Sequence, residues 1–220
     1  MDADGDAGLA GLRAEYRRQG LAESDVDADP LVTFRRWLGA AVAAGLLEPN
    51  AMVLSTVDAQ SRPHARAVLL KGIDERGFRF FTNHGSDKAR QLAANPSCAL
   101  TFVWPALARQ VRVSGTAERL PDVEAAAYFA TRPRGSRLGA WASPQSEVIA
   151  DRDILDRRLA ELDAAYAGSD DIPLPPFWGG YVVVPDIIEL WQGRPNRLHD
   201  RLRYTRHVDA TTWTRERLAP

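Results

Sequence analysis

The densest set of side chains that could do chemistry lies between Trp191 and Arg201. Eleven positions there hold one indole, three arginines and His199, although a structural turn needs only a glycine and a proline. Each arginine carries a planar fork of donors that suits a phosphate or a carboxylate. His199 could transfer a proton or donate a hydrogen bond to Asp200, and a single histidine does not decide between these roles.

Basic residues also lie inside apolar, strand-like runs. Arg66 and Lys71 belong to the run 64–71, and Arg112 follows Gln110 after one residue. Cations beside apolar strands indicate an anionic ligand, whereas the alternative is that each pairs with a nearby acid at the rim of a barrel. In a regular strand Arg66 and Lys71 face opposite sides. A ligand that touches both must therefore sit at a bulge, a strand end or a subunit boundary.

Two other segments carry weaker signals. Residues 128–136 set Tyr128, Arg132 and Ser136 around a proline and a glycine, a composition that can surround phosphate oxygens, although basic loops are common. Residues 141–146 offer an indole, an amide and hydroxyls, which suit a flat heteroaromatic ligand. Helix capping and core packing account for the same residues equally well.

Several kinds of chemistry are disfavoured. No group of His, Cys, Asp and Glu has metal-ligand spacing, and neither a glycine-rich phosphate loop nor a Gly-x-Ser-x-Gly turn is present. We therefore expect no metal, and no hydrolysis by an activated serine. Cys98 is the single cysteine, and its apolar surroundings favour a core position in a reducing compartment, the cytoplasm.

Composition excludes further classes of partner. The chain has 28 basic and 29 acidic residues and a net charge of −1, so no global positive field attracts nucleic acid or an anionic membrane. The longest apolar stretch, 40–47, is far shorter than the roughly 20 residues that span a bilayer. The N-terminus is acidic, whereas a secretory signal begins with positive charge.

The elements that must position these residues are mostly strands. Asp29-Pro30 predicts a helix start, and apolar residues at helical spacing carry that helix to near Gly45. We expect further helices over 86–92, from Pro121, and over 147–166. Alternation with period two predicts strands over 51–57, 64–73, 78–82, 97–104, 108–118, 181–184, 186–192, 200–208 and 212–217.

Short strands at both ends of the chain, with helices between them, predict a mainly β fold. The expected architecture is an antiparallel barrel or sandwich with added helices. Residues 1–28 are predicted to form a mobile N-terminal arm, and residues 29–220 a single domain.

The chain resembles the pyridoxine/pyridoxamine 5′-phosphate oxidase family over nearly its whole length, from residues 12–16 of the N-terminal arm to the last four residues. Many ordered segments at matching separations carry the resemblance: Asp29-Pro30, 51–53, 68–71, 81–83, 109–111, 136–141, 145–146, 175–180, 191–193 and 197–201. The resemblance implies an FMN-binding split β-barrel. It also implies a homodimer with two flavins bound between the subunits, so that two chains contribute to each site.

The family's functional residues carry over onto matching positions. FMN contacts are expected from Arg66, Lys71, Thr82, Lys88, Gln110, Gln145, Ser146, Trp191 and Arg201. The substrate phosphate would be held by Lys71, Tyr128, Arg132 and Ser136, and the substrate ring would be lined by Arg197 and His199. Arg13 and Tyr16 match a lid over the site. Arg197 is the expected main catalytic residue, and His199 is expected to transfer a proton or to orient the substrate.

The implied reaction is hydride transfer from pyridoxine 5′-phosphate or pyridoxamine 5′-phosphate to FMN. The product is pyridoxal 5′-phosphate, and molecular oxygen reoxidises the flavin and gives hydrogen peroxide. The flavin supplies the difficult chemistry, so the protein's task is to anchor the phosphate and to orient the ring.

Two residues depart from the family's pattern. Asp87 stands where many members carry a basic residue beside the FMN phosphate, which predicts somewhat weaker FMN binding. We expect Ser86 to cap the helix there and hold Asp87 toward solvent, and Arg90 to offset its charge. Phe81 replaces a tyrosine before Thr82, and little consequence is expected because the ring is kept.

Three other functions compete with this interpretation. A split-barrel reductase could bind a different flavin or a deazaflavin, since the fold hosts several activities. A non-catalytic protein could sequester pyridoxal 5′-phosphate or FMN. A nucleic-acid-binding module is a third possibility, which the near-zero net charge disfavours.

Overall fold

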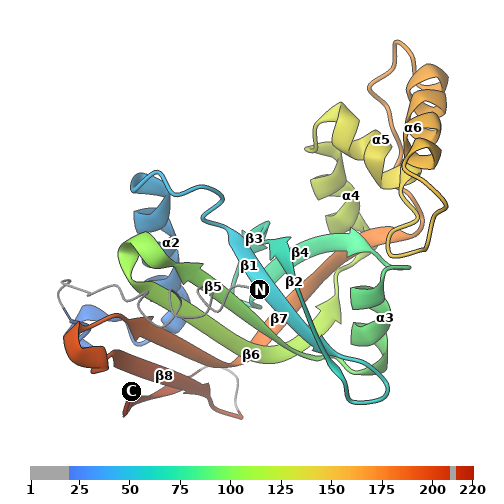
Figure 1. The fold of residues 1–220 in the computed structure, drawn as a ribbon. Coiled ribbons are helices and arrows are strands. Elements are labelled where there is room, and N and C mark those ends of the chain that lie inside the picture. Colours follow the sequence, from blue (N-terminus) through green and yellow to red (C-terminus); the bar gives the residue numbers. More distant parts are fainter. Residues whose placement is uncertain (1–19, 209–211) are drawn as a thin grey trace, which may run out of the picture. The chain divides into compact units, whose positions relative to one another are not determined.

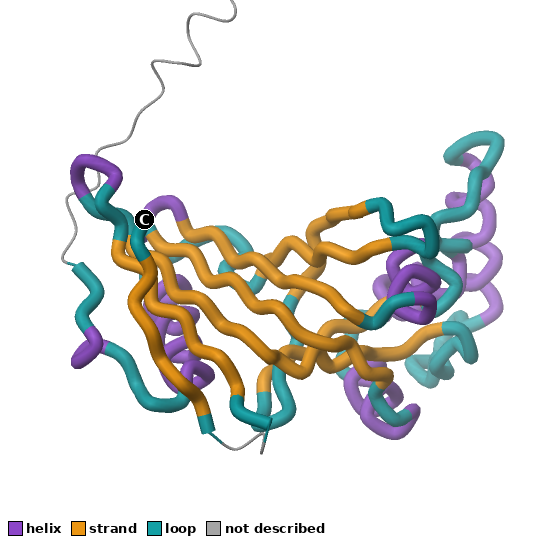
Figure 2. The backbone as a smooth tube through the Cα atoms, turned by 90° about the horizontal axis from the view of Figure 1, so that it is seen from below, coloured by secondary structure: helices purple, strands orange, loops and turns teal. Residues whose placement is uncertain are grey.

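The structure is a computed structural model that describes residues 20–208 and 212–220. Arg13 and Tyr16, the predicted lid residues, lie outside the described residues. The strands form one sheet in the order β2-β1-β5-β6-β7-β4-β3, with β8 paired to β7 and β9 to β8 (Figures 1 and 2). The predicted mainly β fold is confirmed. No helix in the described part of the chain is long and apolar enough to cross a membrane.

The described chain divides into two compact units. The first comprises residues 20–49, 102–112 and 187–220, and the second comprises residues 50–101 and 113–186. Strands β5, β6 and β7 contribute residues to both units. The single domain predicted for residues 29–220 stays a prediction.

The first unit contains helix α2 (Pro30–Ala43) and the parts of β5, β6 and β7 that lie within residues 102–112 and 187–192. It also contains β8 (Asp200–Arg206), β9 (Trp213–Leu218) and the short 3₁₀ turns η2 (Glu23–Asp25), η3 (Pro105–Leu107) and η4 (Pro195–Arg197). The Asp29 carboxylate accepts a hydrogen bond from the Leu31 backbone N–H, and Pro30 occupies the first helical position. The predicted helix start is therefore confirmed, because the cap satisfies a free donor and proline needs none there.

Aromatic rings fill the core of this unit. Phe34 lies 4.8 Å from Phe102 and 6.2 Å from Trp104, measured between ring centroids. The Trp104 indole N–H donates to the Pro49 carbonyl oxygen at 2.9 Å, so its polar atom is satisfied in the core.

The second unit holds most of the sheet and the remaining helices. Its strands are β1 (Ala51–Val57), β2 (Pro63–Leu69), β3 (Gly72–Ile73), β4 (Phe78–Asn83) and parts of β5 (Ser97–Trp104), β6 (Arg109–Arg119) and β7 (Trp178–Gln192). Its helices are α3 (Asp87–Ala94), α4 (Asp122–Ala130), α5 (Arg134–Ala142) and α6 (Asp153–Ala165). β1 pairs antiparallel with both β2 and β5, and β4 pairs antiparallel with β7.

Three predictions of secondary structure are wrong. The single strand predicted over 64–73 is broken after Leu69, so Lys71 lies between β2 and β3 and strand parity does not constrain it. No separate helix was predicted after the one that starts at Pro121, but residues 128–136 end α4 and begin a new helix, α5. Helix α6 begins at Asp153, and not at 147.

β7 is a single strand of 15 residues, where the sequence predicts a loop and two strands. Close packing explains the glycine at position 180, near the start of β7. A Cβ on Gly180 would lie 2.7 Å from the Phe81 ring and from the Leu120 side chain, so only glycine lets β7 pass so close to them.

The segment before α2 packs on the β8–β9 hairpin, although the sequence places it in the mobile arm. Leu21 is buried, and its N–H donates to the Asp200 carboxylate at 2.9 Å. The Arg217 guanidinium donates to both carboxylate oxygens of Glu23 at 2.8 and 2.9 Å. The Tyr204 hydroxyl donates to the Asp27 carbonyl oxygen at 2.8 Å.

This packing predicts an acid-sensitive contact. Hydrogen bonds from Arg217 lower the pKa of Glu23 from 4.5 to about 2. Because the folded-state pKa is depressed, the pair stabilises the protein above pH 4.5, and the contribution is lost as the pH falls toward 2. In urea unfolding, Glu23→Gln should therefore be less stable than wild type at pH 7, and the difference should shrink between pH 4.5 and 3.

Glu161→Gln is the matched control, because Glu161 lies on α6 and makes no ion pair with any residue in the described ranges. A Glu23→Gln difference that stays constant from pH 7 to pH 3 would contradict this account.

Candidate functional site

A cavity of about 790 Å³ lies in the second unit. It is lined from β2, β4, α3, α4, α5 and the first residue of β7, and by residues of the loops between these elements. Seven of the predicted site residues share this lining: Lys71, Thr82, Lys88, Tyr128, Arg132, Ser136 and Gln145. The cavity therefore brings together the predicted phosphate-binding residues and part of the predicted cofactor set.

The Lys88 ammonium group lies among neutral oxygen atoms. Its Nζ donates to Thr82 Oγ1 and to Gln145 Oε1, both at 3.2 Å, and lies 3.4 Å from Ser86 Oγ. Burial lowers the pKa of Lys88, and the charge of Arg66 lowers it further. An anion beside Lys88 would remove this cost, because it would stabilise the charged form.

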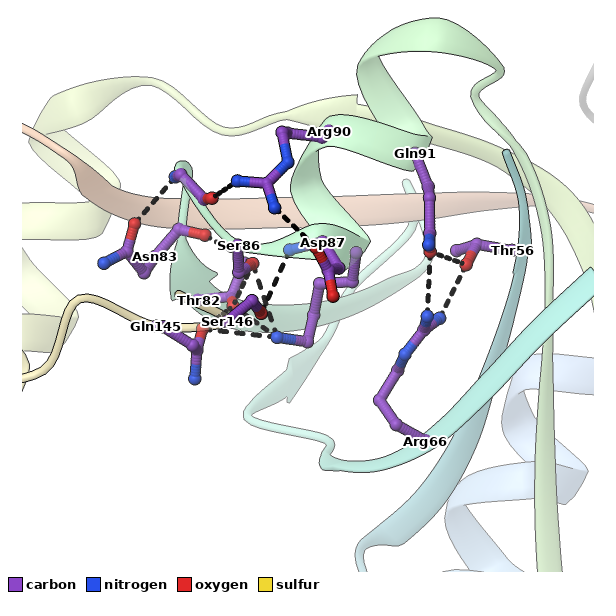
Figure 3. Close-up of polar contacts among 12 residues, drawn as sticks. Thr56, Arg66, Thr82, Asn83, Ser86, Asp87, Arg90, Gln91, Gln145 and Ser146 are labelled. Carbon is purple, nitrogen blue, oxygen red and sulfur yellow. Dashed lines mark hydrogen bonds and ion pairs between the residues drawn. The ribbon is translucent and has the colours of Figure 1, made fainter. Parts of the chain in front are cut away.

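Arg66 is held by neutral acceptors too (Figure 3). Its Nη1 donates to Thr56 Oγ1 at 2.6 Å and to the Leu54 carbonyl oxygen at 3.2 Å, and its Nη2 donates to Gln91 Oε1 at 2.8 Å. The Thr56 hydroxyl itself donates to Gln91 at 2.6 Å. Burial lowers the pKa of Arg66, and Asp87 partly offsets this shift.

The start of α3 differs from the prediction in one respect. Ser86 occupies the N-cap position, but its side chain does not cap the helix. Its hydroxyl instead donates to the Asn83 carbonyl oxygen at 2.7 Å, where it lies beside Thr82 and Lys88. The prediction that Arg90 offsets Asp87 is confirmed by an ion pair between them.

Ser146 contacts the same helix start. Its hydroxyl accepts a hydrogen bond from the Asp87 backbone N–H at 3.1 Å and so satisfies one of the donors that every helix leaves free at its first turn. Ser146 has a φ of +75°, a left-handed conformation that costs roughly 1–2 kcal/mol for a residue other than glycine. Such strain is concentrated at functional sites.

Aromatic rings form one wall of the cavity. The Tyr128 and Phe81 rings stack at 4.0 Å, and Phe81 stacks on Trp178 at 5.5 Å. The Arg132 guanidinium carbon lies 4.8 Å from the centre of the Trp178 ring. Burial lowers the pKa of Arg132 and raises the pKa of Tyr128. Phe81 thus keeps a ring in the wall of the cavity, as expected.

Five predicted site residues belong to the first unit: Gln110, Trp191, Arg197, His199 and Arg201. The ring of His199 lies 4.6 Å from that of Trp191. Its Nδ1 accepts a hydrogen bond from the Arg194 backbone N–H at 3.1 Å. Burial lowers the pKa of His199, and so does the charge of Arg197.

Arg201 and Arg112 follow the alternative in which a cation pairs with an acid. Arg201 donates from Nε and Nη2 to the two Glu189 carboxylate oxygens at 2.9 and 3.1 Å, and from Nη1 to the Ala219 carbonyl oxygen at 2.8 Å. Arg112 lies 3.5 Å from the same carboxylate. Arg66 and Lys88 thus have neutral hydrogen-bond partners, whereas Arg112 and Arg201 share one carboxylate.

Arg197 lies in an exposed, strained turn. Asn196 and Arg197 have φ values of +57° and +61°, and two successive left-handed residues without glycine are costly. Asparagine tolerates this conformation better than most residues. The left-handed pair at Asn196 and Arg197 is a backbone feature that the sequence pattern does not reveal.

Sequence reasoning missed four residues that hold the site residues in place: Thr56, Gln91, Trp178 and Glu189. Thr56 and Gln91 are neutral residues on β1 and α3, and only their three-dimensional contacts distinguish them. Glu189 carried a signal, because a carboxylate inside the apolar strand run 186–192 needs a cationic partner.

The arrangement suits a phosphorylated, planar ligand. Three cations and several hydroxyl groups provide donors for phosphate oxygens, and the aromatic wall suits a flat ring. No cluster of His, Cys, Asp and Glu among the described residues could hold a metal ion.

Comparison with known proteins places this geometry in a family. Residues 38–165 match the family model described as pyridoxamine 5′-phosphate oxidase. Residues 178–220 match the pyridoxine 5′-phosphate oxidase C-terminal dimerisation region.

Individual relatives match over nearly the whole chain. Pyridoxine/pyridoxamine 5′-phosphate oxidase of Rubrobacter xylanophilus is 59% identical over 212 residues, which cover 96% of each protein. The protein of the same name from Pseudomonas paraeruginosa is 58% identical and covers 96% of this chain and 98% of its own.

Solved structures show the same fold. PhzG from Burkholderia lata, in complex with tetrahydrophenazine-1-carboxylic acid, has a TM-score of 0.84 and 31% identity and covers 91% of this chain and 98% of its own. A pyridoxamine 5′-phosphate oxidase-related, FMN-binding protein from Nostoc punctiforme has a TM-score of 0.70 and 20% identity and covers 89% of this chain and all of its own. The split-barrel fold expected from the sequence is therefore confirmed.

The neutral clamp on Arg66 makes a stability prediction. Thr56→Val keeps the side-chain shape but removes the acceptor of Arg66 Nη1, which should cost about 1–3 kcal/mol in urea unfolding. Thr56→Ser keeps the hydroxyl and is the control, with a smaller loss from the missing methyl group. Equal losses in the two variants would show that the hydroxyl does not hold Arg66.

Proposed function

The chain belongs to the pyridoxamine 5′-phosphate oxidase family, and we propose that it oxidises pyridoxine 5′-phosphate and pyridoxamine 5′-phosphate to pyridoxal 5′-phosphate. The proposed cofactor is FMN, and the proposed electron acceptor is molecular oxygen, which is reduced to hydrogen peroxide. Pyridoxamine 5′-phosphate would in addition release ammonia by hydrolysis of an imine.

One observation carries the proposal. The cavity combines Lys71, Lys88 and Arg132 with the hydroxyl groups of Tyr128 and Ser136. A phosphate ester needs such donors, and a pyridine ring needs the adjoining aromatic wall. Three separate cations favour a phosphate ligand over a carboxylate ligand, because a phosphate carries the higher negative charge.

The residues present also fit the phosphate of FMN. Arg66 and Lys88 are partly buried cations whose hydrogen-bond partners are all neutral, so their charges are available to an anion. Thr82, Gln145 and Ser146 lie around Lys88 and the start of α3. When bound, FMN accepts a hydride from the substrate and passes the electrons to oxygen.

The chain's own residues would then bind and orient the substrate. The substrate's phosphate would be anchored by Arg132, Ser136, Tyr128 and Lys71. With its phosphate fixed, the substrate would be held in place beside the bound cofactor, which lowers the entropic cost of the reaction. The aromatic wall would keep water from one side of the ring.

His199 is best suited to orienting the substrate. Its pKa is lowered, and its Nδ1 accepts a hydrogen bond from a backbone N–H. The neutral ring therefore carries its proton on Nε2. A donor at Nε2 would suit the proposed role of orienting the substrate, whereas Arg197 would supply positive charge beside the ring.

We infer that the active form is a homodimer in the cytoplasm. The match of residues 178–220 to a C-terminal dimerisation region supports the dimer. FMN would lie between the subunits, with Gln110, Trp191 and Arg201 completing the set of cofactor contacts. No nucleic acid or membrane partner is proposed.

The test uses the flavin's visible absorption. Protein loaded with FMN is made anaerobic and mixed with pyridoxine 5′-phosphate, and the same is done with pyridoxamine 5′-phosphate. The proposal predicts bleaching that reverses when air is admitted, with release of hydrogen peroxide. A flavin band that persists with both substrates would favour a reductase or a binding protein over an oxidase.

Asp87 gives a second prediction. Its carboxylate attracts Arg66 and Lys88 and would repel the FMN phosphate, although it is 60% exposed and paired with Arg90. Asp87→Asn should therefore tighten FMN binding by about 1.5- to 5-fold, and the gain should shrink at high salt.

Asp156→Asn is the matched control for fluorescence titration with FMN, because Asp156 forms a comparably exposed ion pair on α6, with Arg152. An unchanged FMN dissociation constant in Asp87→Asn would refute the repulsion.

A further inference from the structure

Arg132 lies over aromatic rings, as Arg109 lies over Trp37 and Arg206 over Trp213, but of these three arginines only Arg132 lines the 790 Å³ cavity. Its guanidinium carbon lies 4.8 Å from the centre of the Trp178 ring and 5.5 Å from that of the Phe129 ring. Within residues 20–208 and 212–220, Arg132 forms no ion pair. Aromatic faces therefore take the place that a carboxylate takes elsewhere.

Arg76 and Arg201, by contrast, are neutralised by carboxylates. Arg76 donates to both Asp74 and Glu124, and Arg201 donates to both oxygens of Glu189. An arginine held by a carboxylate is well oriented, but its charge is largely cancelled for any further anion. An arginine held by a ring face is oriented and keeps its charge.

The Nη1 atom of Arg132 supports this interpretation. It is buried and has no hydrogen-bond partner among the described residues. A buried donor without a partner is normally costly, and here the π-face of a large ring offsets part of that cost. The contact thus fixes one edge of the guanidinium while Arg132 remains part of the cavity lining.

Trp178 is itself fixed. It is 8% exposed, belongs to the core cluster with Phe129, Leu138 and Ile172, and begins β7 opposite Asn83. Its backbone N–H donates to the Pro175 carbonyl oxygen at 3.0 Å. A rigid indole is the strongest of the aromatic platforms for a cation.

We propose that Trp178, assisted by Phe129, is a positioning residue that holds Arg132 over its ring without neutralising it and thereby sets the affinity for the substrate's phosphate. This inference rests on the proposed function, because it assigns Arg132 to that phosphate. It adds a determinant of substrate affinity that acts through Arg132.

The test separates substrate binding from turnover. Trp178→Leu and Trp178→Phe are prepared as holoenzymes, and KM and kcat are measured for pyridoxine 5′-phosphate. Trp178→Leu should raise KM by about 2- to 30-fold, the range expected for a partly to fully desolvated cation–π contact. Trp178→Phe should raise it less, and kcat at saturation should stay within about twofold of wild type in both variants.

Equilibrium binding provides a readout that does not depend on turnover. The dissociation constant of pyridoxal 5′-phosphate for each holoenzyme should rise by the same factor as KM. In an Arg132→Gln background, Trp178→Leu should have no further effect on either constant, because the two residues act as one unit.

Phe80→Leu is the matched control for lost packing. Phe80 is a fully buried ring of the same unit that stacks on Tyr181 at 5.5 Å and does not line the cavity. It should lower the Tm as the Trp178 variants do, but leave KM and the dissociation constant unchanged. If Trp178→Leu does not fold, the same constants are measured for the smaller change Trp178→Phe, with Arg132 intact and with Arg132→Gln. Trp178→Phe should then raise both constants only when Arg132 is intact.

Three results would overturn the inference: unchanged KM and dissociation constant in both Trp178 variants, a KM increase matched by Phe80→Leu, or full additivity with Arg132→Gln. Failure of the proposed function is distinct from these results, because wild-type holoenzyme would then not turn over pyridoxine 5′-phosphate at all.

Discussion

Positive charge held by neutral partners is the constraint on which the cavity depends. Lys88 is surrounded by hydroxyl and amide oxygens, Arg66 by Thr56 and Gln91, and Arg132 by ring faces. Burial lowers the pKa of all three groups, which means that their charged forms are destabilised until an anion arrives. A phosphate recovers this free energy, whereas a carboxylate side chain of the protein would have recovered it before any ligand could bind.

The surrounding fold serves to keep these cations apart and oriented. Gly180 lets β7 pass close to Phe81. The rings of Phe81, Tyr128 and Trp178 lie nearly parallel, with centroids 4.0 to 6.2 Å apart. In the first unit, by contrast, the Glu189 carboxylate holds Arg201. Because the Arg201 guanidinium is already paired with Glu189, we infer that it would offer a flavin oriented hydrogen-bond donors more than net positive charge.

Much of this fold could be predicted from sequence patterns. The strands over 51–57 and 97–104 and the start of the helix at Asp29-Pro30 agree with the structure, since alternation and capping are local signals. Helix α5 was not predicted, because Pro133 and Gly135 are typical of a loop; its stability comes from Leu138 packing in the cluster with Phe129 and Trp178. The role of Trp178 could not be predicted either. Arg132 follows α4 and Trp178 begins β7, so the cation–π contact between them joins residues far apart in the chain and produces no sequence pattern.

The most direct test of the account is a crystal structure of the holoenzyme with pyridoxal 5′-phosphate bound. The account predicts that the phosphate lies in the cavity of the second unit, within hydrogen-bonding distance of the Arg132 guanidinium and the Ser136 hydroxyl, with Arg132 still over the Trp178 ring. A phosphate bound away from this cavity, or an Arg132 turned from the ring to pair with a carboxylate, would contradict the claim that unneutralised charge defines the site.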